Sequence, residues 1–274
     1  MSDINWDDRF EVINAINKID NYEELINCRH KINKNLLNDY DFGIEFVKKY
    51  PNGLKKLSKE LQNNYNIVMT AVTNGGCLFS LAYASDELKN NYNIVMTAVK
   101  KDGEALQWAS KELRNNFDIV IKAVINNGKA LQWASDELKN NHNIVIASIK
   151  KNADAFKYAS KEMHNNLSIL TIAVKKNKDL IKYAGDKILN NKEEIIWIYN
   201  NLNKEILKFA NEEMQRQIIV QFIKNDDEIL RYVSNEILED KDFMLELIKI
   251  NYDAMAHIAR RYFRLYCNEC YLDI

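Results

Sequence analysis

The stretch "NNYNIVMTAV" occupies residues 63–72 and returns letter for letter at residues 90–99. A second stretch, "ALQWASKELRNN" at residues 105–116, returns as "ALQWASDELKNN" at residues 130–141. A fixed period in this size range is typical of stacked-repeat proteins, in which each unit packs against its neighbours. The sequence therefore predicts a repeat protein.

Three kinds of residue recur at intervals of 25 along the chain. Asn-Asn pairs begin at Asn90, Asn115, Asn140, Asn165 and Asn190, aromatic residues stand at Tyr83, Trp108, Trp133, Tyr158 and Tyr183, and alanines follow at Ala84, Ala109, Ala134, Ala159 and Ala184. We expect the alanines and the aromatic ladder to form a core between units, and the first asparagines to satisfy backbone groups at the turns. The alternatives are a base-stacking surface for the aromatic ladder and a binding role for the asparagines.

Each unit is predicted to be a pair of short helices. Apolar residues at i, i+1, i+4 and i+5, as in Ile94, Val95, Ala98 and Val99, give the first helix one buried stripe. The second helix is expected to carry Ala105, Leu106, Ala109 and Leu113, with Trp108 beside them. The expected N-caps of the first helices are Asp41, Asn66, Asn93, Asp118, Asn143 and Ser168. Gly76, Gly103 and Gly128 are expected in the left-handed position that closes a helix.

The predicted fold is all-α, an α-solenoid of about nine helix-pair repeats of roughly 25 residues. The repeats extend over residues 35–259 and are clearest at 58–184. Residues 1–34 and 260–274 are expected to be atypical caps. Because no linker rich in Pro, Gly or Ser interrupts the chain, residues 1–274 are predicted to form a single domain.

Composition excludes several classes of protein. Hydrophobic residues at 47% and charged residues at 28% argue against general disorder. We expect no membrane span, because no apolar run approaches about 18 residues. The acidic start "MSDINWDDRF" is unlike a secretory signal, and four scattered cysteines do not form a disulfide framework. A cytoplasmic location, in a viral or host cytosol, is therefore expected.

No candidate for catalysis or for a metal or cofactor site emerges from the motifs. Cys267 and Cys270 form one CxxC without a second pair, whereas a structural zinc site needs four ligands and a redox pair needs a βαβ context. His142 stands where sister units carry Tyr65, Tyr92, Phe117 and Leu167, so we interpret this as a packing position. Phosphate-binding loops and nucleophile elbows are missing from the sequence. We expect no enzyme activity and no cofactor.

Charge is distributed unevenly along the chain. Residues 139–192 carry 11 Lys and no Arg against four acidic residues, a net charge of +7, whereas residues 193–274 carry 10 basic and 16 acidic residues, a net charge of −6. The candidate partner-binding residues in the basic segment are Lys150, Lys151, Lys157, Lys175, Lys176 and Lys182. The alternative is an ordinary solvated surface.

The pattern E-L-x-N-N-x-x-I-V-x-x-A-V-x-x-x-G-x-A-L-x-x-A-S, at residues 87–110 and 112–135, resembles the repeat called domain of unknown function 4116. The resemblance implies a helical repeat fold and an origin in giant viruses, amoebae or bacteria that live in amoebae. It implies no catalytic residue and no cofactor.

The predicted function is a non-enzymatic scaffold that binds a protein or peptide partner on its curved surface. The alternative is nucleic-acid binding through the lysine-rich face of residues 139–192. Lysine without arginine argues against specific reading of bases, since arginine supplies the bidentate fork that recognises guanine.

Overall fold

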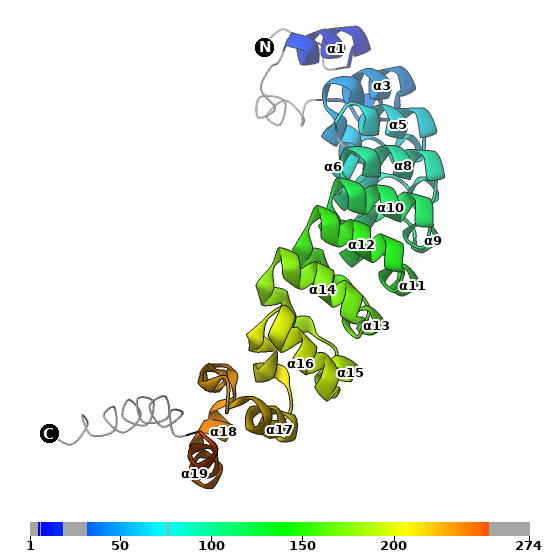
Figure 1. Ribbon diagram of the computed structural model, residues 1–274. Helices are drawn as coiled ribbons and strands as arrows, with labels where there is room; N and C mark the ends of the chain where they lie inside the picture. Colours follow the sequence, from blue (N-terminus) through cyan, green and yellow to red (C-terminus); the bar gives the residue numbers. More distant parts are fainter. Residues whose placement is uncertain (1–4, 6, 19–31, 76, 252–274) are drawn as a thin grey trace, which may run out of the picture. The chain divides into compact units, whose positions relative to one another are not determined.

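The computed structural model describes residue 5 and residues 7–18, 32–75 and 77–251 (Figure 1). Their regular elements are α-helices and 3-10 helices, and no strand occurs among them, so the predicted all-α repeat fold is confirmed. The chain divides into two compact units, unit 1 (Met1–Ala159) and unit 2 (Ser160–Ile274). The single domain and the number of repeats stay predictions.

Unit 1 begins with the helix α1, which packs on α3, and continues as stacked repeats. Its elements are α1 (Arg9–Lys18), η1 (Leu36–Asn38), α3 (Tyr40–Lys49), η2 (Pro51–Lys56), α4 (Lys59–Gln62), α5 (Tyr65–Thr73), α6 (Cys77–Tyr83), α7 (Asp86–Lys89), α8 (Tyr92–Lys101), η3 (Gly103–Trp108), α9 (Lys111–Arg114), α10 (Phe117–Asn126), η4 (Gly128–Trp133), α11 (Asp136–Lys139), α12 (His142–Lys151) and η5 (Ala153–Tyr158). Helices α3, α5, α8, α10 and α12 lie side by side, each in contact with the next (Figure 1).

Unit 2 continues the order of short helix, long helix and 3-10 helix with one exception. Its elements are α13 (Lys161–His164), α14 (Leu167–Lys176), η6 (Lys178–Tyr183), α15 (Asp186–Leu189), α16 (Lys192–Asn201), η7 (Lys204–Phe209), α17 (Glu212–Phe222), η8 (Asp227–Tyr232), α18 (Asn235–Glu239) and α19 (Lys241–Ile250). The exception is that the single helix α17 replaces a short and a long helix between η7 and η8. Within unit 2, η6 contacts η7 and η7 contacts η8.

The predicted second helix of each repeat is in fact two elements. In the repeat that starts at α8, the 3-10 helix η3 ends at Trp108 and the single-turn helix α9 begins at Lys111. Ala109 and Ser110 between them are extended, with ψ of 153° and 164°. Ser110 is the N-cap of α9, and its hydroxyl accepts a hydrogen bond from the N–H of Leu113 at 3.2 Å. The helix is interrupted here because an N-cap residue does not have helical backbone angles.

The N-caps of the long helices lie two residues before the predicted positions. The side chains of Asn64, Asn91, Asn116, Asn141 and Asn166 accept the first-turn N–H groups, and Asp39 rather than Asp41 caps α3. The Oδ1 of Asn116, for example, lies 3.1 Å from the N–H of Ile119. The predicted caps Asn66, Asn93, Asp118, Asn143 and Ser168 are second residues of their helices and are exposed.

The position of the N-cap can be tested by substitution. We expect Asn116→Ala to lower the free energy of unfolding by about 1 kcal/mol, because it removes the acceptor for a first-turn N–H group. Asp118→Ala is the control and is expected to change stability by less than about 0.5 kcal/mol, as an exposed surface substitution does. Urea denaturation followed by circular dichroism measures both. A larger loss for Asp118→Ala than for Asn116→Ala would contradict the caps assigned here.

The first asparagine of each pair joins adjacent repeats. The hydroxyl of Ser110 donates to Oδ1 of Asn90 at 2.5 Å, and the N–H of Ser110 donates to the carbonyl of Lys89 at 2.9 Å. In unit 2, Oδ1 of Asn165 instead accepts the N–H of Lys187 at 2.9 Å. The prediction that this asparagine satisfies backbone groups therefore holds at Asn165, whereas at Asn90 the partner is a serine hydroxyl.

Gly103 and Gly128 do not close helices in the left-handed conformation, so that prediction is wrong. Gly75 is the described glycine with positive φ, at 109°, and Gly76 lies outside the described residues. A Cβ on Gly103 would lie 2.3 Å from the carbonyl oxygen of Ala123, and one on Gly128 would lie 2.5 Å from that of Ser148. These glycines are needed because the backbone of the next repeat passes too close for a side chain.

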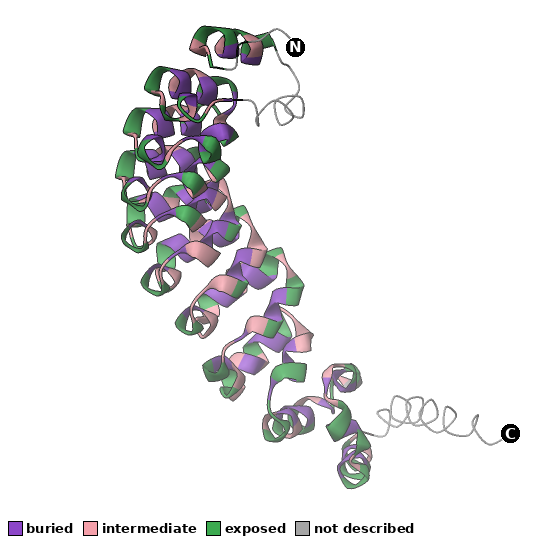
Figure 2. Ribbon diagram, turned by 180° about the vertical axis from the view of Figure 1, so that it is seen from behind, coloured by how far each residue is buried: buried purple, intermediate pink, exposed green. Residues whose placement is uncertain are grey.

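The core is built from the predicted stripe and four of the five predicted alanines, since Ala159 is half-buried, and no member of the aromatic ladder is fully buried. Buried and exposed positions alternate along each helix (Figure 2). Ile94 and Val95 are fully buried, and Ala109 is 6% exposed. Trp108, however, is 39% exposed, and Trp133 is half-buried. The expectation of a buried aromatic ladder is therefore wrong. Tyr83 is exposed like Trp108, and Tyr158 and Tyr183 are half-buried like Trp133.

Trp133 links two repeats through one hydrogen bond. Its Nε1 donates to Oε2 of Glu104 at 3.0 Å, and Asn127 donates to the other oxygen of Glu104 at 3.1 Å. The residue 29 positions before Trp108 is Phe79, which offers no acceptor. The two tryptophans therefore differ in polar contacts although they occupy equivalent positions.

We expect Trp133→Phe to destabilise the protein by about 1–2 kcal/mol, because a charged acceptor loses its donor. Trp108→Phe is the matched control, with an expected change below about 0.5 kcal/mol. Chemical denaturation of both variants measures the difference. Equal losses for the two variants would show that the Glu104 contact contributes nothing.

Candidate functional site

The exposed face of unit 1 carries one aromatic residue at the start of each of four successive long helices. Tyr40, Tyr65, Tyr92 and Phe117, here called the aromatic row, are 44%, 41%, 42% and 43% exposed. They are the first residues of α3, α5, α8 and α10, and each helix contacts the next. Large side chains that recur in register with this exposure form an extended apolar surface, which marks an interaction site more often than scattered exposed residues do.

The middle of the same helices continues this apolar surface. Ile44, Met69, Met96, Ile121 and Ile146 occupy the fifth position of their helices, and all are half-buried. Methionine and isoleucine here give the face an apolar centre, with the aromatic row on one side and the helix C-termini on the other. Methionine adapts to varied apolar partners because its side chain is flexible and polarisable.

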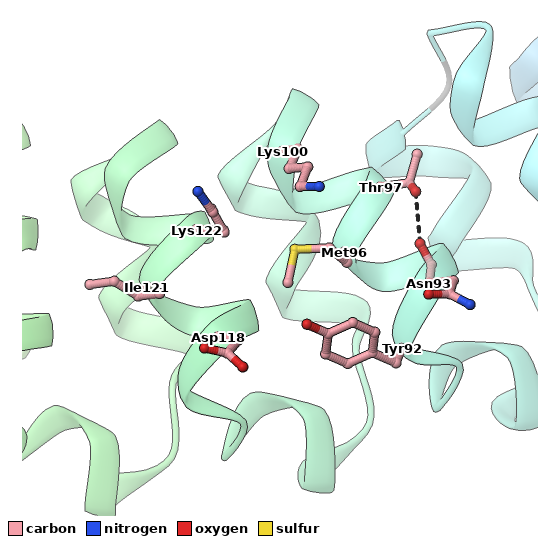
Figure 3. Close-up of a pocket in the computed structure, with 8 residues that line it drawn as sticks. All are labelled: Tyr92, Asn93, Met96, Thr97, Lys100, Asp118, Ile121 and Lys122. Carbon is pink, nitrogen blue, oxygen red and sulfur yellow. Dashed lines mark hydrogen bonds between the residues drawn. The ribbon is translucent and has the colours of Figure 1, made fainter.

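A groove of about 440 Å³ lies on this face between α8 and α10. It is lined by Tyr92, Asn93, Met96, Thr97, Lys100, Asp118, Ile121 and Lys122. Figure 3 shows the two lysines at one end, Tyr92 and Asp118 at the other, and Met96 between them. We call this the α8–α10 groove. Its composition, apolar in the middle and charged at both ends, suits a peptide better than a small apolar ligand.

The interpretation of the His142 position as a packing position is wrong. His142, Tyr92 and Phe117 are all exposed and open their helices directly after the N-cap. The sequence contained a signal for this: at 3.6 residues per turn, Tyr92 lies about 90° from the centre of the stripe formed by Ile94, Val95, Ala98 and Val99, and so at its edge. Because the predicted N-caps lie two residues too late, Tyr92 falls outside the predicted helix, and its position relative to the stripe is not evident from that prediction.

All six predicted partner-binding lysines are exposed, but they divide between the two units. Lys150 and Lys151 end α12 and Lys157 lies in η5, all in unit 1, whereas Lys175, Lys176 and Lys182 belong to unit 2. A common binding face formed by all six stays a prediction.

Two of these lysines contact the aromatic residue that follows them. The Nζ of Lys157 lies 4.8 Å from the ring centroid of Tyr158, and that of Lys182 lies 5.4 Å from the ring of Tyr183. Both distances fall within the range of cation–π attraction. These rings are therefore covered on one face by a lysine of their own repeat, which leaves less of them for stacking on bases.

Unit 2 contains a polar cluster that the sequence did not indicate. Asp226 accepts hydrogen bonds from the hydroxyl of Tyr199 at 2.7 Å and from Nζ of Lys204 at 2.6 Å. Lys204 also lies 5.1 Å from the ring of Tyr199 and 5.9 Å from that of Tyr232. The members come from α16, η7 and η8 and from the turn before η8, at separations unrelated to the repeat, so no spacing could have revealed them.

The cluster stabilises the fold rather than supplying a reactive group. Burial, followed by the bond to Asp226, raises the pKa of Tyr199 far above its usual range, so its phenol stays neutral. Burial alone would raise the pKa of Asp226, but the bonds from Lys204 and Tyr199 outweigh it and lower the pKa. With its carboxylate bound by both donors, the cluster joins successive repeats of unit 2.

A lowered pKa makes this contribution depend on pH. Asp226 is ionised more readily in the folded than in the unfolded chain, so its stabilisation is present above the unfolded pKa of 3.8 and is lost as pH falls below it. We expect Asp226→Asn to be about 2 kcal/mol less stable than wild type at pH 7, with the difference shrinking below about pH 4. Urea denaturation at both pH values measures it. A difference that stays constant down to pH 3 would contradict the assignment.

Among the described residues, no three His, Cys, Asp or Glu side chains converge on a possible metal site. Cys267 and Cys270 lie outside those residues. No helix in the described ranges has the length and apolar character needed to cross a bilayer.

The family comparison agrees with the repeats seen in the fold. The model of the Domain of unknown function (DUF4116) matches residues 44–88, 64–114, 116–164 and 216–262, in both units. Comparisons with curated proteins and with solved structures give no match. The family matches together span more than half of the sequence and follow successive helical repeats. The chain therefore belongs to the DUF4116 domain family.

Proposed function

We propose that this protein is a non-enzymatic helical scaffold that binds a protein or peptide partner across the exposed face of unit 1. The observation that carries the proposal is the aromatic row, whose four members are exposed to nearly the same extent, from 41% to 44%. Stacking of the repeats is accounted for by the buried stripe and alanines, and it does not need aromatic side chains at the exposed first position. Aromatic side chains are the residues most often found as energetic anchors in binding interfaces.

The apolar centre of the same face supports this proposal. Half-buried Met69, Met96 and Ile121 continue the surface from the aromatic row toward the helix C-termini. Repeat proteins commonly present such a row of equivalent positions to an extended partner. Because each repeat offers the same kind of contact, affinity would accumulate along the face.

Selection from a random peptide library displayed on phage tests the proposal. We expect the full chain to enrich peptides that bind it and that fail to bind a variant with all four members of the aromatic row changed to serine. The control carries four serines at exposed positions elsewhere in unit 1, at Lys59, Lys111, Lys129 and Asn52. Thermal denaturation establishes that both variants fold.

Two results would contradict the proposal. Enriched peptides that bind the aromatic-row variant as well as wild type would place the site elsewhere. Failure to enrich any peptide, together with micromolar binding of a labelled 20-mer RNA at 150 mM salt, would favour nucleic acid as the partner. If four lysines bind phosphates, the log–log salt dependence of that RNA affinity would have a slope of about −3.

A further inference from the structure

We infer that the α8–α10 groove binds an extended peptide segment with acidic residues at one end, an apolar side chain in the middle and a basic residue at the other end. This inference rests on the proposed function and assigns the chemistry of its partner. It follows from the charges at the two ends of the groove, from its apolar centre and from its length.

Two lysines form the basic end of the groove. Lys100 and Lys122 line it together, both are exposed, and within the described residues neither takes part in an ion pair. The helix dipole accounts for Lys100, which is the ninth residue of the ten-residue helix α8. It does not account for Lys122, which is the sixth residue of α10. Two ammonium groups on one groove favour an anionic partner, because bringing them together without one is unfavourable.

The opposite end of the groove has the opposite charge. Asp118 is exposed and makes no ion pair with any described residue, and Tyr92 lies beside it (Figure 3). A carboxylate next to an exposed aromatic ring suits arginine or lysine, which pairs with the carboxylate while its stem or cation contacts the ring. A ligand with one acidic and one basic end would complement both ends at once.

Met96 and Ile121 form the centre of the groove, and both are half-buried. An aliphatic side chain placed over them removes apolar surface from water, which is the main source of binding free energy in such contacts. Polar or charged residues at the middle of the ligand would lose this contribution. The centre therefore selects leucine-like side chains.

The length of the groove suits a short extended segment. Tyr92 and Lys100 are eight residues apart on α8, about 12 Å along the axis at 1.5 Å per residue. An extended peptide covers that distance with about four residues. The groove of about 440 Å³ thus accommodates a short extended segment of this length.

Equivalent positions on the neighbouring helices differ in charge, which gives this groove its own specificity. The position of Lys122 is occupied by Glu45 in α3, Thr70 in α5 and Ala147 in α12, whereas the fifth position stays apolar. The repeats thus keep the apolar fifth position, which supplies affinity, and vary the sixth position, which determines the charge of the ligand.

Fluorescence anisotropy with designed peptides tests the inference on the full chain. The acidic probe is a labelled, acetylated and amidated peptide with glutamates at one end, a central leucine and an arginine at the other end, made in both sequence directions. In the basic probe lysines replace the glutamates, and in the third probe serine replaces leucine. We expect wild type to bind the acidic probe, in one of its two sequence directions, with about tenfold higher affinity than the other two probes. We also expect that affinity to fall as the salt concentration rises.

Charge reversal supplies the decisive variant. We expect Lys100→Glu combined with Lys122→Glu to lose about tenfold in affinity for the acidic probe and to prefer the basic probe. The matched control, Lys111→Glu combined with Lys129→Glu, changes net charge equally at exposed residues that do not line the groove. It is expected to retain the wild-type preference. Because all four lysines are exposed, both variants should fold, which circular dichroism verifies.

Three outcomes would overturn the inference. The first is that the acidic probe binds in neither sequence direction up to millimolar concentration. The second is that both double variants lose the same affinity for the acidic probe. The third is that the affinity for the acidic probe is unchanged in the Lys100→Glu/Lys122→Glu variant. If peptides from the library still require the aromatic row in any of these cases, the proposed function stands and only the groove assignment fails. If neither peptide class depends on this face, both fail.

Discussion

Leu131→Ala is expected to lower the free energy of unfolding by about 3–5 kcal/mol. Leu131 is fully buried in η4, in the middle of unit 1. Its 3-10 helix contacts η3 and η5 as well as α10 and α12, so the cavity left by truncation is held open on several sides. A Leu→Ala change at such a site loses both the transfer free energy of the side chain and the contacts around the cavity.

Ile125→Ala is the control for this prediction. Ile125 lies in α10 and is 53% exposed, so its truncation should cost less than about 0.5 kcal/mol. Urea denaturation followed by far-ultraviolet circular dichroism measures both variants. A loss below about 1 kcal/mol for Leu131→Ala would show that adjacent repeats do not pack as tightly as the structure indicates.

The second large effect is expected at Gly128, where even a methyl group has no room. A Cβ there would lie 2.5 Å from the carbonyl oxygen of Ser148 and 2.9 Å from the backbone N of Asn152. Both atoms belong to backbone at the end of α12, so relief requires a shift of the next repeat. We expect Gly128→Ala to destabilise the protein by about 3 kcal/mol, at the upper end of the usual cost of overpacking.

The Gly128→Asn variant distinguishes close packing from the left-handed backbone conformation that the sequence suggested as the reason for glycine at this position. If glycine were needed for a left-handed backbone, asparagine would be tolerated better than alanine, because it adopts that conformation more readily. Close packing predicts the reverse, since asparagine is larger. Lys129→Ala, at the exposed neighbouring residue, is the control. A Gly128→Asn variant that is more stable than Gly128→Ala would contradict the packing explanation.

The fold could be predicted from the sequence because its period, buried stripe and polar caps all repeat together. Ile94, Val95, Ala98 and Val99 form the expected core stripe and are fully buried. The errors were local. Ala109 ends one short helix and Ser110 caps the next, whereas the sequence pattern around them is that of a single helix.

The candidate site was less predictable, because exposure depends on where each helix begins. Placing the cap at Asn93 instead of Asn91 hid the role of Tyr92 as an exposed first residue. The candidate lysines are those of the segment with the highest net charge, residues 139–192, whereas Lys100 and Lys122 lie outside that segment. That Lys122 lies on the same groove as Lys100 of the neighbouring helix is seen only in the stacked structure.

The most direct test of the proposed binding face is a methyl NMR spectrum of the full chain with 13C-labelled methionine, recorded while a peptide from the library selection is added. Met69 and Met96 lie half-buried on that face, whereas Met163 and Met244 are buried in unit 2, at 8% and 3% exposed. We predict that the methyl signals of Met69 and Met96 shift with saturation and that those of Met163 and Met244 stay in place. Saturable binding that leaves Met69 and Met96 unchanged would contradict the assignment of this face as the partner-binding surface.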